Sequence, residues 1–131
     1  METKKAQDWA AFDVIKGLFA FLNKDTISSA SPVIHSALYN LTKKDKYKKF
    51  LKEYVFDHRS YFPFSRDLHT DLLNLQQSGH LSAQNPDFIE YTVNSKLKTT
   101  FELYTKNLFS EQEIAILKEL AKDFTSEMAD A

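Results

Sequence analysis

The sequence predicts a single, mainly helical domain of the α+β class, formed by residues 1–131. The chain contains only 2 Gly and 3 Pro, which are too few for the many turns of a β-sandwich or barrel. Its hydrophobic fraction is 43% and its aromatic fraction is 14%, so it can bury a substantial core and is not a disordered chain. Apolar residues recur at helical spacing along most of its length, whereas residues 88–93 alternate as a strand does.

Three helices are expected in the first half of the chain. The first covers about residues 7–22, and its apolar stripe is so wide that we expect it to be deeply buried or shared with a partner chain: Trp9, Phe12, Ile15, Phe19 and Leu22. Ser31 can cap a second helix, with Pro32 at the first helical position. A third, basic helix is predicted over about residues 44–56, with apolar residues on one side and lysines on the other.

The stretch from residue 64 to residue 93 is the most informative part of the sequence. Ser65 is a good N-cap, and three leucines follow at helical spacing, so a helix is predicted over about residues 65–78. Gly79 is suited to the position just after the helix, where a left-handed conformation is common. Residues 80–82 and 88–93 are strand candidates around a turn at 83–87, which predicts a short β-hairpin directly after the helix.

Two further helices are expected at the C-terminal end. One begins after Asn94 or Ser95, and the other after Ser110, which forms a capping box with Glu113. The last helix, within residues 111–131, has a heptad seam and a frayed end. A seam of this kind is typical of a dimer helix, and the alternative is a helix that packs on its own domain; its candidate interface residues are Ile114, Leu117, Ala121, Phe124 and Met128.

The run from Phe64 through the leucines to Gly79 and Leu81, followed by a hairpin, resembles the winged-helix superfamily. It is most similar to PadR-like domains and to small bacterial winged-helix domains of unknown function, some of them associated with toxin–antitoxin pairs. The resemblance covers about residues 7–108. It implies a winged helix-turn-helix with a β-hairpin wing and additional C-terminal helices. It also implies binding to double-stranded DNA, often as a homodimer, with the helix at 65–78 as the reading element.

Two groups of residues are candidates for nucleic-acid binding. A count of 100° per residue places one group on the outer face of the helix at 65–78: Arg66, His69, Thr70, Asn74 and Gln77. The second group would contact phosphates, although a solvated helix face is an alternative explanation: Lys43, Lys44, Lys48 and Lys49. Arg66 is the only cation on the reading helix, Asp67 and Asp71 flank its outer face, and the turn at 83–87 has no Lys or Arg.

Charge and residue usage set further bounds. The net charge is −1, but residues 41–60 are basic and residues 111–131 are acidic, so we expect separate basic and acidic regions on the surface. The absence of cysteine excludes disulfides, thiolate zinc sites and cysteine nucleophiles. The one concentration of acids and histidines, at residues 57–71, lacks the spacing of a metal or hydrolase site. We therefore expect no enzymatic activity, no cofactor and no metal. We also expect a cytoplasmic protein without a membrane-spanning segment.

These observations lead to two functional hypotheses. The leading hypothesis is a dimeric, non-enzymatic DNA-binding regulator of transcription that places its helix at 65–78 in the major groove, with lysines on phosphates. The second is a winged-helix module for protein interaction, such as an antitoxin-like or defence-complex subunit, that does not bind DNA. The acidic edge of the reading helix and the wing without cations favour the second hypothesis.

Overall fold

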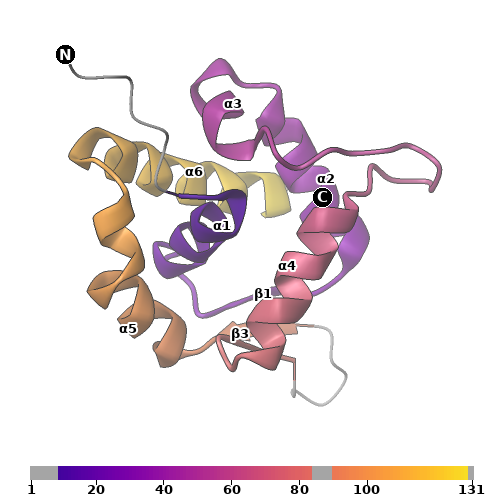
Figure 1. Ribbon diagram of the computed structural model, residues 1–131. Coiled ribbons are helices and arrows are strands. Elements are labelled where there is room, and N and C mark those ends of the chain that lie inside the picture. The colour runs from indigo at the N-terminus through magenta and orange to yellow at the C-terminus, as the bar shows by residue number, and fades with distance from the viewer. Residues whose placement is uncertain (1–8, 84–89, 130–131) are drawn as a thin grey trace.

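The computed structural model describes residues 9–83 and 90–129, and the chain is mainly helical with one small antiparallel sheet (Figure 1). The order of elements is α1 (Ala11–Ala20), β1 (Thr26–Ser28), α2 (Ser31–Thr42), α3 (Asp45–Leu51), α4 (Arg66–Gln77), β2 (Leu81–Ser82), β3 (Glu90–Val93), α5 (Ser95–Leu103), the 3-10 helix η1 (Thr105–Leu108) and α6 (Glu111–Ala129). An α+β fold is therefore confirmed at the level of its class.

Helix α1 lies at the centre of the molecule and contacts α3, α5 and α6 (Figure 1). Val14, Ile15 and Leu18 have no exposed surface, which explains why the apolar stripe of this helix is so wide. The helix is shorter than predicted because Trp9 precedes it in an extended segment; residues 7 and 8 lie outside the described part. The Trp9 ring stacks on Phe50 at 5.1 Å and on Phe109 at 5.3 Å, and so joins α1 to α3 and to the start of α6.

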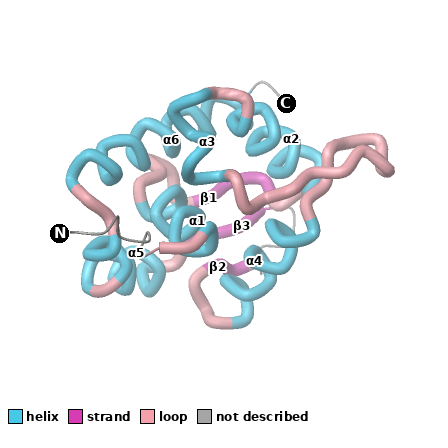
Figure 2. Tube along the Cα trace, turned by 45° about the horizontal axis from the view of Figure 1, so that its top comes forward, coloured by secondary structure: helices cyan, strands magenta, loops and turns pink. Residues whose placement is uncertain are grey.

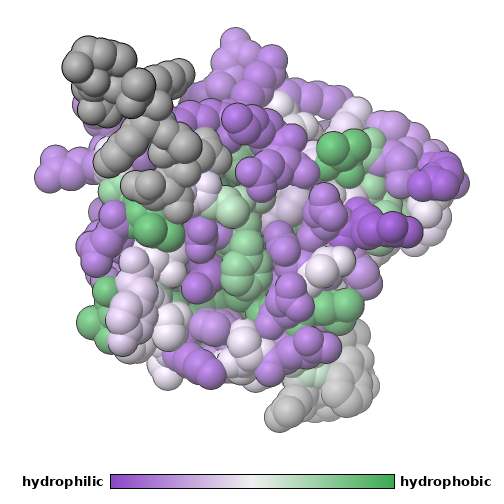
Figure 3. Space-filling view, viewed as in Figure 1, coloured by the Kyte–Doolittle hydropathy of each residue, from purple (hydrophilic) through white to green (hydrophobic). Residues whose placement is uncertain are grey.

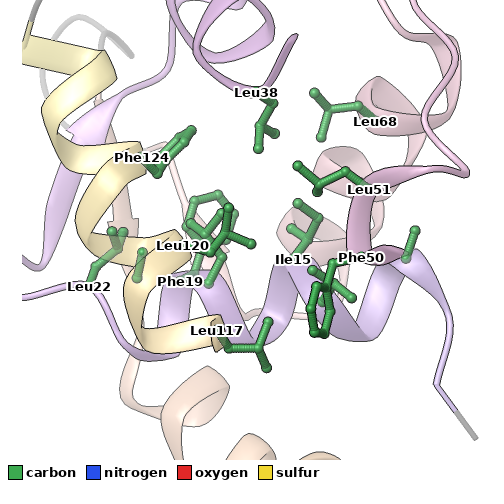
Figure 4. Packing of buried hydrophobic residues seen from close by; sticks show 14 of the residues in the cluster. Ile15, Phe19, Leu22, Leu38, Phe50, Leu51, Leu68, Leu117, Leu120 and Phe124 are labelled. Atoms are coloured by element: carbon green, nitrogen blue, oxygen red, sulfur yellow. The ribbon is translucent and has the colours of Figure 1, made fainter. Parts of the chain in front are cut away.

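The heptad seam of α6 faces the chain's own core. Leu117 and Phe124 are fully buried, Ala121 is nearly so, and α6 packs along α1 and α2 (Figure 4). Phe124 meets Phe19 of α1 edge to face at 6.2 Å. The residues predicted as a dimer interface, Ile114, Leu117, Ala121, Phe124 and Met128, are thus core or partly buried positions, because α1 and α2 already occupy the seam. The homodimer remains a prediction without support from these residues.

The sheet has the order β1-β3-β2, and both pairs are antiparallel. Pairing of Leu81 with Val93 and of Ser82 with Thr92 confirms the predicted hairpin strands, and most of the predicted turn between them lies outside the described residues. Strand β1 was not expected from the sequence. It pairs Ile27 with Tyr91, so the hairpin after α4 is fastened to the segment between α1 and α2.

A protruding arm, residues 55–64, joins α3 to α4 and extends away from the body of the molecule (Figures 1 and 2). Helix α3 ends at Leu51 rather than near residue 56, and the Tyr54 amide closes its last turn by donating to the Leu51 carbonyl at 3.0 Å. Two backbone hydrogen bonds between Asp57 and Phe64, of 2.8 and 3.0 Å, close the base of the arm.

Candidate functional site

Both ends of α4 are built as the sequence predicts. The Ser65 hydroxyl accepts a hydrogen bond from the Leu68 amide at 3.3 Å, which confirms Ser65 as the N-cap. Gly79 has a φ of +83°, and the amides of Gly79 and His80 donate to the carbonyls of Gln76 and Leu75. This is a Schellman end, which turns the chain directly into β2. Leu68, Leu72 and Leu75 are buried and fix the inner face of the helix.

The outer face of α4 is exposed, as the residue count of 100° per position predicts. It carries the five candidate residues and the side chain of Leu73, which is 42% exposed: Arg66, His69, Thr70, Asn74 and Gln77. On the molecular face drawn in Figure 3, hydrophilic residues dominate and hydrophobic ones form small separate patches. The outer face of α4 is therefore an exposed, polar surface with one cation on it.

The lysines of α3 do not form a free basic surface. Lys49 Nζ lies 2.8 Å from Glu113, Lys44 lies 3.8 Å from Asp123, and Lys46 lies 3.7 Å from both Asp123 and Glu119. The basic and acidic segments of the sequence therefore meet across α3 and α6, so the two charged regions expected on the surface adjoin each other. Burial and the hydrogen bond to Asp123 (2.6 Å) also raise the pKa of the Tyr47 phenol.

The other two candidate lysines also have contacts within the chain. Lys48 lies 3.0 Å from Asp45, and Lys43 Nζ lies 4.5 Å from the ring centre of Tyr39. Helix α4 meets the segment after α3, through Tyr54 and Asp71, and no ion pair or hydrogen bond joins a candidate lysine to a candidate residue of α4 among the described residues. The structure thus brings together the candidates on α4, but it does not bring the candidate lysines to them.

An acidic cleft of about 250 Å³ lies along one edge of α4, where that helix faces the start of α1 and the end of α3. The Tyr54 hydroxyl lies 2.6 Å from Asp71 Oδ2 and 3.2 Å from the Ala11 carbonyl, and its proton is best donated to the closer carboxylate. Burial raises the pKa of Asp71 above its usual value; the hydrogen bond from Tyr54 opposes this shift, and the nearby carboxylates of Asp67 and Glu53 add to it. This edge would repel a phosphate backbone.

His35, which the sequence analysis did not single out, is a fully buried residue of α2 beneath the arm. Its ring stacks on Phe64 at 4.7 Å, and its Nδ1 accepts a hydrogen bond from the Ser65 amide at 3.1 Å. Because Nδ1 accepts this bond, it carries no proton, and the neutral ring has its proton on Nε2. Nε2 has no hydrogen-bond partner among the described residues. Burial, and to a smaller extent His69, lowers the pKa of His35 to about 4. The signal available in the sequence was that His35 lies among the apolar residues of the second predicted helix.

The arm carries the most exposed large apolar side chains of the described residues. Tyr61 is 89% exposed and Val55 is 74% exposed, whereas Phe64 turns inward onto His35. The inward ring of Phe64 packs at the base of the arm, and Tyr61 is left as an exposed aromatic side chain further along it. Tyr61 meets Phe62 edge to face at 5.1 Å.

Within residues 9–83 and 90–129, no group of three or more histidine, aspartate or glutamate side chains is placed to hold a metal ion. No helix in this part of the chain is long and apolar enough to cross a membrane. No family model, no curated protein and no solved structure matches this chain.

Proposed function

We propose that this chain is a winged-helix module that binds a protein partner through the outer face of α4 and the adjoining arm. The fold reading is supported by the capped helix, its Schellman end and the hairpin that β1 fastens to the body of the domain. These features support the winged-helix fold alone, and a fold by itself does not specify a function.

The observation that carries the choice of partner is the distribution of charge. Phosphate neutralisation by Lys and Arg supplies most non-specific DNA affinity, and each neutralised phosphate needs a free cation. Lys44, Lys46 and Lys49 are paired with α6, and the edge of α4 is acidic. A polar helix face with one arginine, beside an exposed aromatic arm, is a surface better suited to a protein than to a duplex.

A dimeric DNA-binding regulator is the second candidate. It is favoured by the joint exposure of Arg66, Asn74 and Gln77 on α4, since these residue types can read guanine and adenine in a major groove. Its phosphate contacts would require the lysines of α3 to exchange their carboxylate partners for DNA.

Binding to mixed-sequence duplex DNA at low and at moderate salt separates the two candidates. Our proposal expects no measurable binding even at low salt. Binding that falls steeply with salt, and that is lost on combining Lys48→Glu with Lys49→Glu, would establish the regulator instead.

Site-specific photo-crosslinking, in the cells that naturally make this protein, tests directly whether a protein binds the outer face of α4 and the arm. A photoreactive residue at position 70 or position 74 of α4, or at position 61 of the arm, is expected to link to the same partner protein. The matched control is position 115, an exposed residue of α6 on another part of the surface. Equal crosslinking from position 115 would show that the contact is not made by α4 and the arm.

A further inference from the structure

Helix α6 carries opposite charges on two different edges. Its acidic edge faces α2 and α3, where Glu113, Glu119 and Asp123 meet lysines and Glu127 accepts a hydrogen bond from Asn40 at 3.1 Å. Lys118 and Lys122 are one turn apart and differ by about 40° around the helix, whereas Asp123 lies about 140° from Lys118. The two lysines therefore lie side by side on one edge of the helix; Glu119 is about 60° from Lys122, but its carboxylate forms an ion pair with Lys46.

This basic edge borders a cleft of about 390 Å³ between α6 and the C-terminal end of α1. Its polar lining comes from both elements, around the ring of Phe21: Asn23, Lys118, Lys122, Thr125 and Ser126. None of the lining residues carries a carboxylate. The volume lies in the range of small-molecule sites, which is about 300–1,000 Å³.

The position of Lys118 is supported by the aromatic core. Its Nζ lies 5.4 Å from the ring centre of Phe21, and that ring is itself held edge to face on Phe101 at 5.3 Å. A cation over an aromatic face is attracted by the electron-rich ring. The charge at the mouth of the cleft is thus placed by residues that also anchor α1 to α5.

Lys118 and Lys122 have no counter-ion among the described residues, unlike Lys46, Lys48 and Lys49 of α3. Within the described ranges, neither Lys118 nor Lys122 forms an ion pair or a hydrogen bond, and neither caps a carbonyl at the end of α1. Lys44, Lys46 and Lys49, in contrast, each face a carboxylate of α6. The cleft therefore combines two ammonium groups without a counter-ion with the amide of Asn23 and the hydroxyl of Ser126 as hydrogen-bond donors, whereas the Thr125 hydroxyl donates to the Ala121 carbonyl.

We propose that this cleft binds a phosphate-bearing small molecule. Phosphoryl oxygens accept charge-assisted hydrogen bonds from ammonium groups, and the two lysines, one helical turn apart, both line this cleft. The hydroxyl and amide groups of Ser126 and Asn23 complete the donor set. This proposal is independent of the partner assigned to α4, because the cleft lies on α1 and α6.

Calorimetric titration of the full chain at low salt tests the proposal with three probes: sodium tripolyphosphate, ATP and adenosine. We expect tripolyphosphate and ATP to bind and adenosine not to bind, since the phosphoryl groups carry the interaction. ATP that binds more tightly than tripolyphosphate would identify a nucleotide as the natural source, and equal affinity would identify the phosphoryl chain alone. Adenosine binding as tightly as ATP, or no binding of either phosphate compound, would overturn the proposal.

A pair of matched double variants locates the site. Lys118→Gln with Lys122→Gln is expected to weaken tripolyphosphate binding about tenfold or more, as the loss of two charge-assisted contacts predicts. Lys48→Gln with Lys52→Gln removes the same charge from the exposed surface of α3 and should change the affinity less than about twofold. Equal losses in the two variants would mean that only overall charge matters, and the cleft would not be a site. Far-ultraviolet circular dichroism shows whether each variant is folded.

Discussion

Helices α3 and α4 both bury apolar residues on one face, but the polar residues on their other faces have different surroundings. On α3, lysines meet the carboxylates of α6 at distances from 2.8 to 3.8 Å. On α4, Thr70, Asn74 and Gln77 are exposed. The comparison shows that abundant charge does not by itself mark a free surface: lysines of α3 are paired within the chain, whereas the polar outer face of α4 is exposed.

The inner and outer faces of α4 should differ most. Leu68→Ala removes a fully buried side chain and should lower the free energy of unfolding by about 2–5 kcal/mol. Leu73→Ala on the same helix removes a side chain that is 42% exposed, and should cost less than about 1 kcal/mol. Urea titration followed by circular dichroism measures both values. Similar losses would mean that the outer face of α4 also contributes to the core.

Acid should weaken the junction between α2 and α4 through His35. The pKa of this histidine is lowered to about 4 in the folded protein from an unfolded value of 6.5, so the unfolded state binds more protons between these two pH values. The contribution of neutral His35 to the free energy of unfolding is therefore fully present above pH 6.5. It is lost progressively as the pH falls from 6.5 toward 4, by about 2–3 kcal/mol in total.

Unfolding free energies at several pH values between 4 and 7 measure this loss. His35→Gln keeps a polar side chain but cannot titrate, so the variant should lose most of the slope in this window even if it is less stable throughout. His80 also has a pKa lowered by burial and will contribute a smaller residual slope. An unchanged slope in the variant would assign the acid sensitivity to other groups.

The contact between α3 and α6 should be sensitive to the loss of one carboxylate. Asp123→Asn removes the partner of Lys44 and Lys46 and weakens the hydrogen bond from the Tyr47 hydroxyl, at a cost of about 1–2 kcal/mol. Part of this difference should disappear at high salt, because ion pairs at the surface are screened. Thermal unfolding at two salt concentrations checks both statements, and a cost that does not depend on salt would assign the effect to the Tyr47 hydrogen bond alone.

The outer face of α4 should matter least for folding. Thr70→Ala combined with Gln77→Ala is expected to change the free energy of unfolding by less than about 0.5 kcal/mol, since both side chains are exposed. The same double variant should reduce partner crosslinking from position 61 of the arm. A variant that unfolds easily, or one that crosslinks as well as the original chain, would contradict the separation of roles between the two helices.

The oligomeric state is best tested on the intact chain by light scattering. A chain shortened to end at Phe109 would remove Leu117, Leu120 and Phe124 from the core, so its behaviour would report on unfolding rather than on assembly.

Local patterns in the sequence predicted the parts of the structure that are determined locally. The Ser65 cap, the Gly79 turn and the Ser110–Glu113 capping box are each formed by residues within a few positions of one another, and all are present. Strand β1 was missed because it has three residues and pairs with residues more than sixty positions away. A pattern over a few neighbouring residues carries no information about that pairing.

The candidate site was predicted only in part, because only some of its features are determined by neighbouring residues. Helical periodicity was enough to place Asn74 and Gln77 on the outer face of α4. It could not show that lysines at 44–49 meet carboxylates at 113–123, or that the Ser65 amide binds a histidine thirty residues earlier. Both depend on how helices dock, which is determined by the whole core.

The docking of α6 onto α1 and α2 also affects how the chain is made. Residues 21–110 separate α1 from α6, so the ribosome synthesises most of the domain before the helix that covers Ile15 and Phe19 exists. Until α6 leaves the exit tunnel, the aromatic and aliphatic side chains of α1 lack their final neighbours, and such surfaces are prone to aggregation. Folding of this domain is therefore completed only after synthesis of its last helix, and holdase chaperones have their main opportunity in that interval.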